Sequence, residues 1–170
     1  MSEPKGRGAV WTSTVRVPTA GAMRDLGVRL AGLLRAGDLV VLSGGLGSGK
    51  TTLTQGVGEG LKVRGPITSP TFVIARVHPS LAGGPALVHV DAYRLGGLAE
   101  VDDLDLDASL DEAVTVVEWG AGLVEGLAAD RLVVELTTTA AADAPGDGAD
   151  EERIVQFTAI GGRWSGVSPL

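Results

Sequence analysis

Apolar and polar residues repeat with two different periods in the N-terminal part of this 170-residue chain. Residues 11–17 alternate, which predicts a short strand. The next apolar positions recur at helical spacing, with Thr19 as the N-cap and an end near Gly37. The continuous apolar run at 39–43 is typical of a strand in a parallel sheet that is covered on both faces, and 50–62 reads as a second helix. The apolar face of the first helix consists of Met23, Leu26, Leu30, Leu33 and Leu34.

The second half of the chain carries mainly strand patterns. Residues 68–79 read as a turn followed by a strand, 86–95 as a strand with a polar end, and 113–120 as another apolar strand. Residues 131–139 and 152–160 alternate with period two, which predicts a wide antiparallel hairpin. Strands and helices alternate early and strands dominate later, so the pattern favours an α/β domain around a mixed sheet.

A glycine-rich motif connects the strand at 39–43 to the helix that follows it. Gly44, four further residues, Gly49, Lys50 and Thr51 fill the template of a phosphate-binding loop. Glycines allow the backbone N–H groups to approach phosphate oxygens, and the first turn of the helix adds partial positive charge. In a chain with 26 glycines the alternative is a chance glycine-rich turn, but the order of strand, motif and helix favours nucleotide binding. The expected nucleotide-binding residues are Gly44, Gly45, Leu46, Gly47, Ser48, Gly49, Lys50, Thr51 and Thr52.

The motif also predicts a metal ion. We expect Lys50 to reach the β and γ phosphates of bound ATP or ADP, and the hydroxyl of Thr51 to bind the Mg²⁺ ion that bridges them. Such a site also needs carboxylates at the ends of neighbouring strands, to support the metal or to orient the attacking water. Asp91 and Glu118 follow apolar strand patterns and are the candidates. The alternative is that either acid merely turns the chain out of the sheet.

Composition narrows the chemistry further. The chain contains no cysteine, which excludes disulfides and thiolate sites, and its net charge of −7 disfavours direct binding of DNA or RNA. No apolar stretch approaches the roughly 20 residues of a membrane span, and the N-terminus lacks a signal-peptide core, so we expect a cytoplasmic protein without membrane contact.

His78 and His89 have no acids at ligand spacing, so a zinc site is disfavoured and both are expected to be structural or exposed. The acidic run at 100–112 is either a docking face or a solvated surface.

Four ordered motifs give the chain a family resemblance. They are "GGLGSGKTT" in the loop, "TSPTF" around residues 69–71, "DAYRL" from Asp91 and "EWG" from Glu118, and the likeness runs from about Val10 to Leu136. In this combination the chain resembles the TsaE family, the bacterial ATPases of tRNA threonylcarbamoyladenosine biosynthesis. It departs from the usual family pattern at Gly45, Phe72 and Ala92.

The resemblance implies roles for particular residues. Thr51 and Glu118 would be tied to Mg²⁺, Asp91 would be needed for hydrolysis, and Lys50 completes the expected catalytic set. Ser69, Pro70 and Thr71 would behave as a switch segment. The implied activity is a weak ATPase that acts through a threonylcarbamoyltransferase complex with proteins of the TsaB and TsaD type, and that meets tRNA only indirectly.

These expectations combine into one fold and one domain. The predicted fold is a P-loop NTPase-like, three-layer α/β domain around a mixed, mostly parallel sheet, with a C-terminal antiparallel hairpin. A single P-loop ATPase domain should span 10–162, with a flexible tail at 1–9, a mobile hairpin linker at 139–151 and a C-terminal tail at 163–170. A small-molecule kinase is the alternative function, although no basic cluster follows the loop. A GTPase-type switch is disfavoured because the chain has no asparagine to read guanine.

Overall fold

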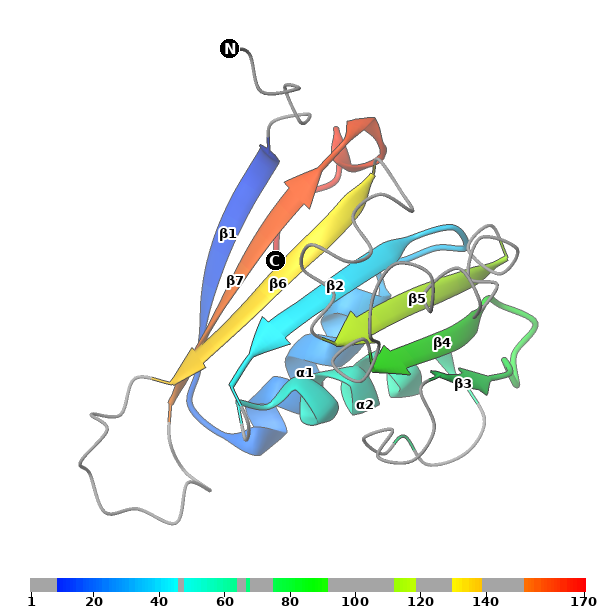
Figure 1. The fold of residues 1–170 in the computed structure, drawn as a ribbon, viewed down its shortest axis with the longest axis horizontal. Helices are drawn as coiled ribbons and strands as arrows, with labels where there is room; N and C mark the ends of the chain where they lie inside the picture. The colour runs from blue at the N-terminus through cyan, green and yellow to red at the C-terminus, as the bar shows by residue number, and fades with distance from the viewer. Residues whose placement is uncertain are drawn as a thin grey trace.

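The computed structural model describes residues 9–45, 48–63, 67, 75–91, 112–118, 130–138 and 152–170, and only the backbone of Ala75 and Asp91. In these residues a seven-stranded sheet has the order β1-β7-β6-β2-β5-β4-β3, and two α-helices pack against it (Figure 1). In chain order the elements are β1 (Ala9–Val17), α1 (Ala20–Ala31), β2 (Leu39–Gly44), α2 (Lys50–Leu61), β3 (Ala75–His78), β4 (Ala86–Asp91), β5 (Ala113–Glu118), β6 (Arg131–Thr138), β7 (Arg153–Ile160) and the 3₁₀ turn η3 (Gly162–Trp164).

Parallel and antiparallel pairings occupy different parts of the sheet. The four central strands β6, β2, β5 and β4 run parallel to one another. The outer pairings β1–β7, β6–β7 and β3–β4 are antiparallel. The predicted mixed sheet and the predicted C-terminal hairpin are therefore confirmed, and the parallel character belongs to the centre, from which the glycine-rich loop emerges.

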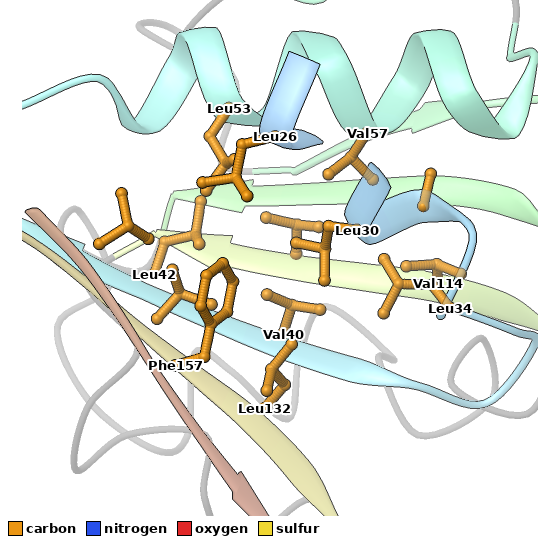
Figure 2. Packing of buried hydrophobic residues seen from close by; sticks show 14 of the residues in the cluster. Leu26, Leu30, Leu34, Val40, Leu42, Leu53, Val57, Val114, Leu132 and Phe157 are labelled. Carbon is orange, nitrogen blue, oxygen red and sulfur yellow. The ribbon is translucent and has the colours of Figure 1, made fainter. Parts of the chain in front are cut away.

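Both described helices cover the same face of the sheet (Figure 1). Figure 2 shows Leu26, Leu30, Leu53 and Val57 of α1 and α2 packed toward side chains of the sheet such as Val40. Leu39 and Val41, the intervening residues of β2, are also 0% exposed. This confirms that β2 is buried on both faces, as its unbroken apolar run predicted. The described residues therefore form two layers, the sheet and one layer of helices, of the three layers that the sequence predicted.

The first helix is shorter than its hydrophobic pattern suggested. It ends at Ala31, because the Gly32 N–H bonds back to the carbonyls of Arg29 and Leu30 and tighter turns follow. Leu34, from the predicted apolar face, nevertheless stays in the core at 8% exposure. The predicted end near Gly37 was therefore wrong: the apolar period continued through turns that no longer form a helix, and Gly37 instead turns the chain toward β2 with φ of 95°.

The residues after β7 pack against the domain. We expected 163–170 to form a tail, but Trp164 is 1% exposed and belongs to the hydrophobic core. Strand β7 pairs with β1 and brings the residues that follow it back alongside β1. The large apolar side chain of Trp164 is buried there. The expected tail at 1–9, apart from Ala9, and the hairpin linker at 139–151 lie outside the described residues.

Candidate functional site

The glycine-rich loop leaves the centre of the sheet and enters a helix without an intervening element. Strand β2 ends at Gly44 and α2 begins at Lys50. Within the loop the Ser48 N–H donates to the Gly45 carbonyl at 3.1 Å, and Gly49 adopts a left-handed conformation with φ of 103°. Leu46 and Gly47, both predicted to bind nucleotide, lie outside the described residues.

Close packing around Gly44 leaves no room for a side chain. A Cβ atom at this position would lie 2.6 Å from Ser48 Oγ and 2.8 Å from the backbone oxygen of Leu136 on β6. At Gly49 a Cβ atom would lie 3.0 Å from Cε of Met23, so α1 supports the end of the loop. The loop is therefore confined by β6 on one side and by α1 on the other.

The two helices begin differently. In α1 the side chain of Thr19 caps the helix by accepting a hydrogen bond from the Ala22 N–H at 3.0 Å. In α2 the N-cap is Gly49, which provides no side-chain cap. The first N–H groups of an α-helix have no acceptor within the helix, and together they favour an anion. In α1 one of these N–H donors is bound by the side chain of Thr19. The N-terminus of α2 has no such side-chain acceptor.

Two further polar side chains of the motif lie at the loop. Lys50 Nζ donates to the Gly44 carbonyl at 2.6 Å, so the ammonium group lies at the start of the loop. Ser48 is only 3% exposed, and its hydroxyl has no hydrogen-bond partner within the described part of the chain. A buried hydroxyl without a partner is unfavourable, so it indicates a place where a bound group completes the hydrogen bonding.

Both candidate acids end neighbouring strands, as predicted. Asp91 is the last residue of β4 and Glu118 the last residue of β5. In the parallel register Glu118 is paired with Asp91 on one side and with Leu42 of β2 on the other. The sheet therefore brings these acids next to the strand that feeds the loop, although the side chain of Asp91 lies outside the described residues.

His89 contacts one of these acids. Its Nε2 lies 3.0 Å from Glu118 Oε1, His89 is 0% exposed and Glu118 is 6% exposed. From the sequence we expected His89 to be structural or exposed, without a zinc site, and its contact with Glu118 was not predicted. The available signal was its place two residues before Asp91, because alternation along a strand puts residues i and i+2 on the same face.

These residues fit a nucleotide with its metal ion better than a metal ion held by protein alone. The uncapped helix, the ammonium of Lys50 and the unpaired Ser48 hydroxyl suit phosphate oxygens. Mg²⁺ usually takes one or two protein oxygens and completes its shell with phosphates and water. Thr51, half-buried in the first turn of α2, and Glu118 supply oxygens of this kind. No group of three His, Asp or Glu side chains that could hold a metal occurs in the described ranges.

Other sequence-predicted features cannot be placed. The switch-like residues Ser69, Pro70 and Thr71 lie outside the described residues, as do Phe72, Ala92 and most of the acidic run at 100–112. None of the described helices is long and apolar enough to cross a membrane.

Comparison with known proteins identifies similar sequences and a similar fold. The family described as threonylcarbamoyl adenosine biosynthesis protein TsaE matches residues 17–144. A Streptomyces coelicolor protein named tRNA threonylcarbamoyladenosine biosynthesis protein TsaE is 66% identical over 144 residues, which cover 84% of this chain and 94% of that protein. A Bacillus subtilis protein of the same name is 36% identical over 135 residues, covering 79% and 77%. The crystal structure of Bacillus subtilis YdiB has a TM-score of 0.64 and 30% identity over 91% of this chain and 89% of that chain. The matched family segment contains the loop, α2 and both strand-end acids.

Proposed function

The chain belongs to the TsaE family, and we propose that it is a Mg²⁺-dependent ATPase, slow by itself, that serves threonylcarbamoylation of the adenosine beside the tRNA anticodon. The family takes part in tRNA threonylcarbamoyladenosine biosynthesis, as the names of the relatives state. The observation that carries the ATPase part of the proposal is the uncapped N-terminus of α2, directly after a loop too tightly packed for a side chain at Gly44.

The loop binds the phosphates in this proposal. N–H groups at the start of α2 and the hydroxyl of Ser48 donate to phosphate oxygens, and the Lys50 ammonium adds a full positive charge. The contact of Lys50 with the Gly44 carbonyl holds that charge at the loop before nucleotide arrives. Preorganised donors of this kind stabilise negative charge in the transition state without reorganising during the reaction.

Thr51 and Glu118 would hold the metal in this proposal, and Asp91 would act beside them. When bound, Mg²⁺ neutralises phosphate charge as the terminal bond breaks. Thr51 offers its hydroxyl from the first turn of α2, and Glu118 offers a carboxylate from the end of β5. Asp91 ends the adjacent strand and is the candidate to orient the attacking water.

Partners supply the tRNA chemistry. With a net charge of −7 the chain is poorly suited to bind the tRNA backbone directly. We place it as a component that acts through a threonylcarbamoyltransferase complex with proteins of the TsaB and TsaD type. Hydrolysis should therefore be faster when those proteins and tRNA are present.

The test is Mg²⁺-dependent phosphate release from ATP and from GTP, with and without the partner proteins and tRNA. We expect slow release from ATP by the wild type, faster release with partners, and none above background for Lys50→Ala. Lys62→Ala is the matched control, because Lys62 is exposed at the opposite end of the same helix. Equal rates for Lys50→Ala and wild type would refute the nucleotide site. Indifference to the partners, or strong preference for GTP, would refute the role in tRNA modification and leave only nucleotide binding.

A further inference from the structure

A buried contact connects the proposed metal ligand to the neighbouring strand. Glu118 continues the alternation of Val114 and Val116, which face the helices, and His89 continues the same face of β4 from Leu87. Their side chains meet between the two parallel strands, with His89 Nε2 at 3.0 Å from Glu118 Oε1. The contact is diagonal, because His89 is paired with Val116, two residues before the pair of Asp91 and Glu118 that ends both strands.

The two oxygens of Glu118 have different environments. Oε1 is engaged by His89, whereas Oε2 has no hydrogen bond to any described residue. The side chain is 8% exposed, against 0% for His89. A buried carboxylate is strongly destabilising unless hydrogen bonds compensate its lost hydration. The histidine thus stabilises one oxygen in place and leaves the other available to a ligand.

The contact also fixes the orientation of the imidazole. An ionised carboxylate only accepts hydrogen bonds, so the proton of the ring must be on Nε2 for this contact to form. Nδ1 is buried and has no hydrogen-bond partner in the described part of the chain. Glu118 is therefore the single described group that selects the Nε2–H tautomer.

We propose that His89 is a positioning residue for Glu118, which it holds by the Nε2–H donor while the second carboxylate oxygen stays available to the ion that would bind with the nucleotide. The inference rests on the proposed function, in which Glu118 supports Mg²⁺. Partners that orient a metal ligand in this way restrict its rotamers and raise its affinity for the ion. Removal of the donor should weaken the response to Mg²⁺ without weakening the phosphate contacts of the loop.

Three variants separate the effect of the His89 hydrogen-bond donor from the effect of side-chain packing. His89→Leu removes the hydrogen bond, and His89→Gln keeps an amide N–H donor where Nε2 lies. Leu87→Val is the packing control, because Leu87 is equally buried two residues earlier on the same strand face. Thermal unfolding of each purified variant shows which of them are folded at the temperature of the binding experiment.

The first measurement is the binding of β,γ-imido-ATP, by calorimetry, as Mg²⁺ is titrated and again in EDTA. We expect His89→Leu to need about 10- to 100-fold more Mg²⁺ for half-maximal binding, the range found for partners of metal ligands. Affinity in EDTA should stay within about twofold of wild type. His89→Gln should recover most of the Mg²⁺ response, and Leu87→Val should match the wild type.

The second measurement does not depend on a variant at position 89. The chain contains only two histidines, so ¹⁵N-histidine labelling gives two imidazoles, which His78→Gln assigns. We expect His89 to be the Nε2–H tautomer in the wild type, and its ring nitrogens to shift in Glu118→Gln more than those of His78.

The outcomes distinguish this inference from the proposed function. If Glu118→Gln raises the Mg²⁺ requirement and His89→Leu does not, the positioning role is overturned and the metal role of Glu118 stands. If His89→Gln folds like the wild type but responds to Mg²⁺ like His89→Leu, the hydrogen bond is not the cause and the inference fails. If Glu118→Gln leaves the Mg²⁺ requirement unchanged, the metal assignment fails and this inference fails with it.

Discussion

Neighbouring glycines of the loop differ in what surrounds them. A Cβ atom at Gly44 would lie 2.8 Å from the Leu136 backbone oxygen, which cannot rotate away. At Gly45 a Cβ atom would have nothing within 4 Å. Gly45, one of the three positions where this chain departs from the usual family pattern, therefore has room for a side chain. Gly44, the first glycine of the motif, does not, because neighbouring atoms fill that space.

This contrast gives a matched pair of substitutions. Gly44→Ala should destabilise the fold by about 1–3 kcal/mol, the usual effect of overpacking, and should weaken ADP binding because Ser48 and the loop must shift. Gly45→Ala should leave both properties near wild type. Chemical denaturation measures the first quantity and calorimetry with ADP the second. Wild-type binding by a folded Gly44→Ala protein would contradict a tightly set loop.

At the scale of elements, α1 and α2 approach each other through glycines. A Cβ atom at Gly56 would lie 2.1 Å from the Arg24 carbonyl oxygen, and one at Gly27 would lie 2.3 Å from the Leu53 carbonyl oxygen. Both obstacles are backbone atoms. The helix that carries the N-terminal donors is therefore positioned by direct backbone contact with α1.

Alanine substitutions at these helix positions test whether the gain in helix propensity or the steric clash has the larger effect on stability. Replacing glycine by alanine inside a helix usually stabilises it by up to about 1 kcal/mol. In Gly56→Ala this gain should be outweighed by the clash, which costs about 1–3 kcal/mol or more because backbone must move. Gly21→Ala in α1 is the control, since its Cβ would meet only Thr19 Oγ1 at 3.8 Å. Denaturant midpoints of both variants measure the difference, and an unfolding free energy for Gly56→Ala at or above that of Gly21→Ala would refute the close contact.

The elements were largely predictable, but some of their contacts were not. Alternation located the outer strands, and the unbroken apolar run located β2, because both patterns reflect local burial. Gly56, by contrast, reads from sequence as an unfavourable helix residue, and only its approach to the Arg24 carbonyl explains it. The strand-end acids were predictable because parallel strands finish at one edge of the sheet. The pairing of Glu118 with His89 was not, because it depends on which strand lies beside β5.

At the scale of the molecule, the ends of the described chain meet. Strand β1 pairs with β7 from Ala9 opposite Ile160 to Val17 opposite Arg153. Trp11 donates from Nε1 to the Trp164 carbonyl at 3.2 Å, and the two indole rings meet edge to face at 6.3 Å. Partners so far apart in sequence leave no local pattern. This is why strand order and the burial of Trp164 were not anticipated.

An ion pair also joins the residues after β7 to the start of β2. Arg163 donates from Nε to Asp38 Oδ1 at 2.9 Å and from Nη2 to Oδ2 at 3.0 Å, and Nη2 also reaches the Leu33 carbonyl at 2.7 Å. The side chains are 10% and 3% exposed. Asp38 directly precedes β2, so the C-terminal residues hold the start of the strand that leads to the loop.

Arg163→Ala therefore tests whether the C-terminal residues are part of the domain. The substitution leaves Asp38 buried with only the Arg35 N–H as a described partner, and breaking a buried pair in this way costs about 3–5 kcal/mol. At about 2–4 °C per kcal/mol for a chain of this size, even the lower figure lowers the melting temperature by about 6–12 °C. Arg24→Ala breaks an equally short pair with Glu59, at 2.7 Å, whose side chains are 54% and 55% exposed. Exposed pairs contribute about 0–1 kcal/mol, so that control should melt within a few degrees of wild type. Equal melting temperatures for the two variants would mean that the residues after β7 behave as the tail that the sequence suggested.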